Sequence, residues 1–167
     1  GYDGHGDQSS TRRGGWDPKA RLVDMDEEGI DVAGLFGGVI GMGTAVGEEP
    51  GLGVALAEGY NNWLHDYCSH SPERLKGVAL VHLEDIQNSC REARRAITEL
   101  GAVGILLHPV FNGLTLDNPY FFPLYEEAEA IDAPLLVHGP SELRYHLQDR
   151  YYHTHFRRHA VDFPVSL

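Results

Sequence analysis

Short apolar runs alternate with longer segments of helical periodicity along most of this chain. The apolar runs are Ile30 to Phe36, Lys76 to Leu83, Val103 to Leu107 and Pro134 to Val137. They are short and mostly apolar along their length, and no hairpin turn joins one run to the next, which is typical of parallel strands buried on both faces. The pattern therefore predicts four parallel strands.

Helices are predicted between these strands. The first begins at Pro18 with Asp17 as its cap and ends at Gly29, and Met25 and the later Ile30 fit its buried side. The other three are predicted over Val54 to about His70, over Glu84 to Leu100, and over Tyr120 to Ile131 after an Asn118-Pro119 cap. In the Glu84 to Leu100 helix, Glu92, Arg94 and Arg95 are expected to face outward and Gly101 to end it.

The spacing of the strands indicates the fold class. Strands separated by helices and spaced roughly 30 to 45 residues apart are typical of a (β/α) barrel or of an open doubly wound sheet. A complete barrel has eight such units in about 250 residues. The fold predicted here is therefore α/β, and as a barrel the chain would be about half of one.

Composition excludes several functional classes. The chain has 167 residues, 13 basic against 25 acidic, and a net charge of -12, which argues against a nucleic-acid or anionic-membrane surface. Its two cysteines, Cys68 and Cys90, lie in predicted helices without metal-site spacing, so reduced thiols and a cytoplasmic location are expected. No apolar stretch reaches the roughly 20 residues that span a bilayer. The chain lacks an initiator Met, and we expect it to be part of a longer protein.

Two histidines directly follow predicted strands. His138 ends the fourth strand and His108 the third, at the edge of a parallel sheet where such proteins carry their chemistry. A neutral imidazole there is a possible zinc ligand, although a hydrogen-bonded core histidine is the alternative for each. His82 ends the second strand similarly, but Glu84 begins the next helix, which favours a structural role for His82.

The other motifs of the chain give weaker indications of function. The segment Gly37 to Gly53 has seven glycines but no phosphate-binding spacing, and it predicts a loop over the strand ends. No nucleophile elbow is present, and neither cysteine ends a strand. His153-Thr154-His155 is an H-x-H, but it lies in a predicted helix, where the two side chains point to different faces. His153 and Arg157 could instead line the mouth of the site and pair with an acidic substrate.

Several motifs in fixed order resemble one enzyme family. They are R-L-x-D-M-D-E-x-G-I-D, N-N-W-L, P-E-R-L-K-G before a strand, G-x-x-G-I, L-D-N-P-x-F-x-P-L-Y-E-x-A and P-L-L-V-H. The chain from about Trp16 to Leu167 is similar to the amidohydrolase-related metalloenzymes, in the branch of aminocarboxymuconate-semialdehyde decarboxylase. The resemblance implies a partial (β/α)8 TIM barrel, about strands 2 to 5. Residues 1–15 would be a loop or truncated N-terminal part, and residues 16–167 the partial barrel domain.

The resemblance also implies a site. The family binds a divalent metal, usually zinc, through an H-x-H after strand 1, histidines after strands 5 and 6, and an Asp after strand 8. His138 matches the fifth-strand ligand. His108 ends the preceding strand at the same rim, where it would bind substrate or take part in catalysis. No H-x-H ends a strand before Trp16, Gly4-His5-Gly6 is no substitute for one, and the remaining ligands are not in this chain.

The sequence thus predicts part of a metal-dependent enzyme of the hydrolase or decarboxylase type. Its substrate would be a small carboxylate or a cyclic amide, ester or lactone, and the fragment alone would be inactive. Two alternatives stay open. One is a non-catalytic α/β domain, in which the Gly-rich loop binds a small anion or a partner. The other is a half barrel that is inactive or is self-sufficient only as a homo-oligomer, because its strand edges are open.

Overall fold

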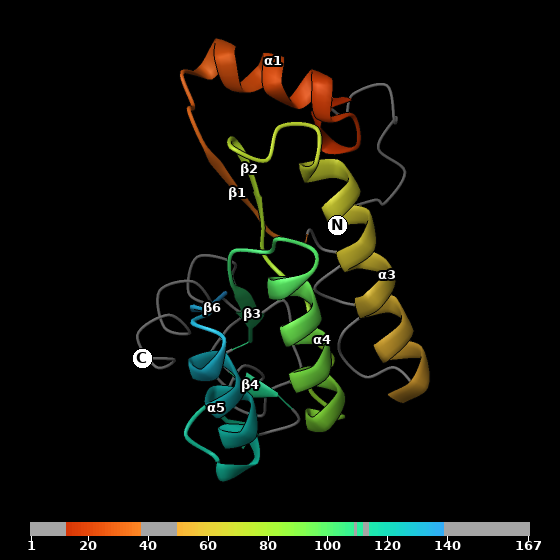
Figure 1. Cartoon of the computed structure of the whole chain (residues 1–167), viewed down its shortest axis with the longest axis vertical. Coiled ribbons are helices and arrows are strands. Elements are labelled where there is room, and N and C mark those ends of the chain that lie inside the picture. The colour runs from red at the N-terminus through yellow and green to blue at the C-terminus, as the bar shows by residue number, and fades with distance from the viewer. Residues whose placement is uncertain (1–12, 38–49, 109, 112–113, 139–167) are drawn as a thin grey trace, which may run out of the picture.

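A computed structural model describes residues 13–37, 50–108, 110–111 and 114–138, and every structural statement below concerns these residues (Figure 1). The elements in chain order are η2 (Arg13–Gly15), α1 (Pro18–Glu28), β1 (Ala33–Leu35), α3 (Pro50–Cys68), β2 (Leu75–Gly77), α4 (Ile86–Thr98), β3 (Ile105–Leu107), β4 (Val110–Phe111), β5 (Leu114–Thr115), η3 (Pro119–Phe121), α5 (Phe122–Ala130) and β6 (Leu135–Val137). Strands and helices alternate as the sequence predicts.

The four predicted strands pair in parallel and in chain order. β1 pairs with β2, with Ala33 opposite Leu75, and β3 pairs with β6, with Ile105 opposite Leu135. A parallel bridge between Ala79 and Ile105 joins the two pairs. The spatial order β1, β2, β3, β6 is the order expected for consecutive strands of a (β/α) barrel. The α/β prediction is therefore confirmed.

The first helix ends as its sequence predicts. Asp17 Oδ1 accepts hydrogen bonds from the backbone N–H groups of Lys19 and Ala20, at 3.0 and 3.4 Å. Gly29 adopts the left-handed conformation with φ 71°, which glycine tolerates without strain. Met25 is buried at 1% exposure, but the prediction for Ile30 is wrong, because its side chain is 41% exposed. Ile30 already lies in the turn beyond the helix.

Three segments differ from their predicted bounds. The α3 helix begins at Pro50, so the end of the Gly-rich segment is helical, and residues 38–49 of that segment lie outside the described residues. The loop after His108 contains an antiparallel pair, β4 with β5. Residues 13–15 form one 3-10 turn instead of loop. None of these changes alters the order of the parallel strands.

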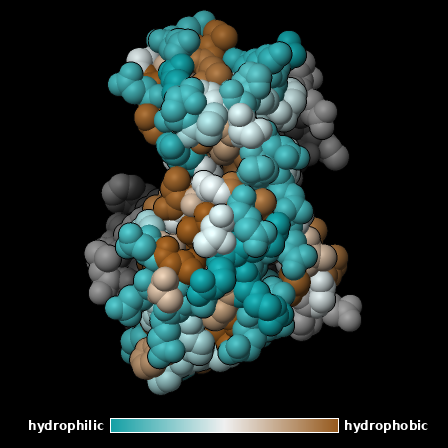
Figure 2. All heavy atoms as spheres, in the orientation of Figure 1, coloured by the Kyte–Doolittle hydropathy of each residue, from teal (hydrophilic) through white to brown (hydrophobic). Residues whose placement is uncertain are grey.

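The main core lies between the sheet and the helices α4 and α5. It contains Leu107 and Phe121, with Leu124 from α5, each at most 1% exposed. A separate cluster joins α1 to β1, β2 and α3 through Met25 and Leu75. In Figure 2, hydrophobic side chains also reach the surface, including at the end of the molecule where α1 lies. No helix among the described residues is long and apolar enough to cross a membrane.

Glu92 was expected to face outward, and this prediction is wrong. Its side chain is 3% exposed and accepts a 2.7 Å hydrogen bond from Asn61 Nδ2. The guanidinium of Arg95 donates to both carboxylate oxygens, each at 2.8 Å. A buried carboxylate is tolerated when it is paired and hydrogen-bonded in this way. The contact joins α3 to α4.

Candidate functional site

His108 and His138 directly follow the ends of two paired strands. They follow β3 and β6, whose last residues Leu107 and Val137 are paired in register. The backbone N–H of His138 donates to the carbonyl of Leu107 at 3.0 Å. The structure thus brings the two histidines to one edge, at the carboxyl ends of the strands. This is the edge where (β/α) proteins hold their catalytic groups.

The His108 imidazole is buried without a hydrogen-bond partner. The residue is 5% exposed, and neither ring nitrogen has a partner among the described residues. Burial lowers the pKa of His108, and positive charge on nearby His138 lowers it further. The ring is therefore neutral near pH 7 and keeps one nitrogen lone pair available. Unpaired buried polar atoms are costly and call for an explanation, such as an ion or a ligand.

Phe36 stands beside His138 at the same edge. The two ring centroids are 5.8 Å apart with an interplanar angle of 47°. Phe36 directly follows β1, is 40% exposed, and brings a third strand end to the site. No sequence motif marks Phe36 as a site residue. Its position as the last apolar residue of the first predicted strand was the signal that could have found it.

His82 is packed into the interior. It is fully buried, and its Nε2 lies 3.5 Å from Glu84 Oε2. A methyl group on Gly53 of α3 would come within 2.2 Å of the His82 ring, so the imidazole packs directly against the helix backbone. These contacts agree with the structural role that the sequence favours for His82.

The described residues do not form a complete metal centre. They contain no group of three or more His, Cys, Asp or Glu side chains that could hold a metal ion. His138, the metal ligand expected from the sequence, would therefore need further ligands to complete a site. His5, His153 and Arg157 lie outside the described residues. Cys68 and Cys90 are free cysteines.

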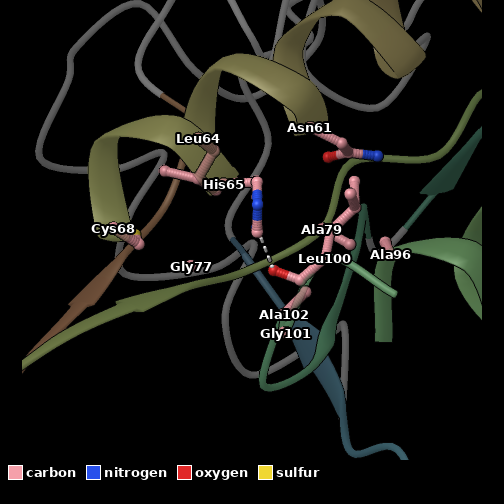
Figure 3. A pocket seen from close by; sticks show the side chains of 10 residues that line it. All are labelled: Asn61, Leu64, His65, Cys68, Gly77, Ala79, Ala96, Leu100, Gly101 and Ala102. Atoms are coloured by element: carbon pink, nitrogen blue, oxygen red, sulfur yellow. Dashed lines mark hydrogen bonds between the residues drawn. The ribbon is translucent and has the colours of Figure 1, made fainter. Parts of the chain in front are cut away.

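A small cavity has neither His108 nor His138 in its lining (Figure 3). Its volume is about 20 Å³, and its lining includes His65, Cys68, Gly77, Leu100 and Gly101. Figure 3 shows His65 reaching across it, with Nδ1 hydrogen-bonded to the Leu100 carbonyl at 2.8 Å. A space of this size holds about one water molecule. It is a packing feature between α3, β2 and the turn before β3.

These features define the class of protein: part of a (β/α) barrel with imidazoles at the carboxyl ends of its strands. The amidohydrolase family model matches residues 2–164, and the chain belongs to this family. The family expected from the sequence motifs is thereby confirmed.

Several of the relatives are decarboxylases. The chain is 30% identical to 2-amino-3-carboxymuconate-6-semialdehyde decarboxylase of Dictyostelium discoideum, over 74% of this chain and 34% of the relative. It is 30% identical to gamma-resorcylate decarboxylase of Rhodococcus jostii, over 77% of this chain and 44% of the relative. Among solved structures, 5-carboxyvanillate decarboxylase of Novosphingobium aromaticivorans, with bound manganese and 3-methoxy-4-hydroxy-5-nitrobenzoic acid, superimposes with a TM-score of 0.66. It is 33% identical, over 71% of this chain and 34% of that chain.

The chain spans about a third to under half of the length of these relatives. The fold is correspondingly a partial barrel.

Proposed function

We propose that this chain is part of a metal-dependent decarboxylase that acts on a small aromatic or unsaturated carboxylic acid. The observation that carries the proposal is the pair His108 and His138 on paired parallel strands, with both ring nitrogens of buried His108 unpartnered among the described residues. The relatedness to decarboxylases favours loss of CO₂ over hydrolysis of an amide, ester or lactone. A non-catalytic binding domain would leave this histidine pair without a role.

Each residue has a proposed role at this edge. His138 is a metal ligand, and the bound ion would orient the substrate carboxylate and stabilise charge that develops as CO₂ leaves. His108, kept neutral by burial, donates a hydrogen bond to the substrate or orients a ligand. Phe36 offers a flat apolar wall beside His138. His153 and Arg157 remain candidates for pairing with the substrate's negative charge.

The identity of the metal depends on the remaining ligands. The resemblance implies zinc, whereas the carboxyvanillate decarboxylase structure contains manganese. Imidazole suits zinc well, and carboxylate and water ligands suit manganese. The single proposed ligand in this chain, His138, does not decide between the two ions, so both are tested.

The test is metal binding by the chain with and without its histidines. Mn²⁺ and Zn²⁺ are titrated by calorimetry into the wild type, His138→Ala and His108→Ala. We expect weak binding and no turnover by the wild type, because most ligands are missing, and at least tenfold weaker binding after His138→Ala. His65→Ala is the matched control, because His65 lies at the small cavity, and it should bind like the wild type. Equal affinity of His138→Ala and wild type would overturn the assignment, as would tight stoichiometric metal with activity in this chain.

A further inference from the structure

A larger cavity lies between η2, α1, β1 and α3, and Phe36 is one of its lining residues. Its volume is about 330 Å³, within the range of small-molecule sites, and we call it the aromatic groove. Its walls include the rings of Phe36, Tyr60, Trp63 and Tyr67, and Arg21 of α1 also lines it. Gly14, Gly15 and Gly34 leave backbone exposed to it.

Three of the rings form a continuous wall along α3. Tyr60, Trp63 and Tyr67 are spaced at i, i+3 and i+7, which puts them on one helix face. The centroids of Tyr60 and Trp63 are 5.9 Å apart, and those of Trp63 and Tyr67 are 5.4 Å apart, both pairs tilted by 40°. Trp63 is 45% exposed although it belongs to this wall. Such a surface suits the flat face of an aromatic ring.

Arg21 supplies the positive charge of the groove. Its guanidinium is permanently charged, and the residue is part of the lining. The neighbouring phenols add no charge near neutral pH: burial, assisted by Cys68, raises the pKa of Tyr60 to about 12, and the Tyr67 hydroxyl donates to the Gly14 carbonyl at 2.5 Å. A guanidinium that lines a groove of aromatic rings suits a carboxylate.

One acidic group limits the charge of a ligand. A methyl group on Gly14, which lines the groove, would lie 2.6 Å from Asp24 Oδ2, so this carboxylate lies next to a lining residue. Its charge disfavours a second negative group on the ligand. We propose that the aromatic groove binds a planar aromatic monocarboxylate, with its ring against Trp63 and its carboxylate on Arg21. Phe36 is shared with the histidine site, whereas Arg21 and Trp63, which carry the proposed binding, line the groove itself.

The fluorescence of Trp63 can report ligand binding in the groove. In a Trp16→Phe background Trp63 is the remaining tryptophan, and Trp16 does not line the groove. Benzoate is the probe, titrated while Trp63 fluorescence is followed. Cyclohexanecarboxylate has the charge without the flat ring, and benzyl alcohol has the ring without the charge. We expect a saturable change with benzoate and clearly weaker binding of both controls.

Two variants locate the binding. Arg21→Gln should raise the Kd for benzoate about tenfold or more, because a charge-assisted hydrogen bond is lost, whereas His138→Ala should leave it unchanged. Loss of binding in His138→Ala with normal binding in Arg21→Gln would place benzoate at the histidines and overturn the proposal. So would the absence of saturation. If Arg21→Gln does not fold, the salt dependence of binding is measured on the wild type. The affinity for benzoate must then fall with added salt, and the affinity for benzyl alcohol must not.

Discussion

At the scale of single residues, the Asn61 side chain forms the backbone hydrogen bonds of Leu80 that a neighbouring strand would otherwise form. This side chain donates to the Leu80 carbonyl at 2.8 Å and accepts from the Leu80 N–H at 2.8 Å. Its amide also donates to Glu92. Each of these groups is buried, so one side chain satisfies backbone that would otherwise be unpaired, just before the chain reaches His82.

Asn61→Ala should therefore destabilise the fold strongly. It leaves the Leu80 N–H and C=O and one Glu92 oxygen without this partner, and buried unpaired groups cost about 1–3 kcal/mol each, so a loss of about 3 kcal/mol or more is expected. Asn62→Ala is the matched control. Asn62 makes an exposed contact with Arg95, and its loss should cost less than about 1 kcal/mol. Urea unfolding followed by circular dichroism compares them, and equal losses would contradict this role of Asn61.

Tyr60 predicts a pH dependence of stability. Its pKa is raised in the folded state from 10.0 to about 12, mainly by burial. The folded state therefore holds this proton more tightly than the unfolded state, so the stabilisation is complete below pH 10 and is lost as the pH rises toward 12. After a discount for partial exposure, roughly 1–2 kcal/mol is involved.

Tyr60→Phe tests this directly. The variant should lose less stability than the wild type between pH 9 and about pH 11, measured as urea midpoints. Trp63→Phe changes the neighbouring ring without removing a titrating group, and it should keep the wild-type slope. An unchanged slope in Tyr60→Phe would show that other tyrosines, such as Tyr67, account for the alkaline loss.

The residue scale also shows what the sequence could and could not reveal. His108 and His138 were found because parallel strands present their carboxyl ends at one edge, so two strand ends sufficed. The burial of Glu92 was not found, because its partner Asn61 lies 31 residues earlier and no local pattern links them. Charge on a helix indicates exposure unless a distant polar partner is known.

At the scale of elements, α3 packs closely against the chain after β2 because a glycine lies at the contact. Gly53 allows the fully buried His82 ring to lie against the helix backbone. Gly53→Ala should cost about 1–3 kcal/mol, because the ring or the helix must move. Gly59→Ala in the same helix, with nothing within 4 Å of the added methyl, should instead stabilise by about 0.5–1 kcal/mol.

Thermal unfolding of both alanine variants gives the comparison. The penalty of Gly53→Ala should shrink in a His82→Ala background, since the clash is then removed. A penalty that persists there would mean that the glycine is needed for another reason.

Local sequence signals account for the element bounds that were predicted correctly. Asp17, Pro18 and Gly29 carry local signals for the ends of α1, and the structure places those ends as expected. The β4–β5 pair was missed, because each strand has only two residues and the segment reads as turn. Short pairings of this kind depend on the surrounding fold more than on local pattern.

At the scale of the whole molecule, the sheet has two open sides within the described residues. β1 pairs only with β2 and β6 only with β3 there, and Val32 and Val137, next to or in these strands, are 55% and 44% exposed. Open edges favour association between chains. The net charge of -12 opposes it, and salt screens that repulsion.

We therefore expect association that grows with protein concentration and with salt, measured by analytical ultracentrifugation. Val137→Lys should reduce it, because an edge lysine disfavours strand pairing. Val23→Lys is the control, since Val23 is also exposed, at 56%, but lies on α1, and it should change association less. A chain that stays monomeric at high salt and concentration would show that these edges are covered.

The strand order also bears on how the protein is made. Each of the four parallel strands pairs with the one before it along the chain, from β1 to β6. The partners lie a whole strand-helix unit apart, as Ala33 and Leu75 do, so each pairing is slower to form than a hairpin. Each unit can still pair before the next is synthesised, because folding during synthesis begins from the N-terminal side. The two histidines would come together only with the last of these units, when β6 joins β3.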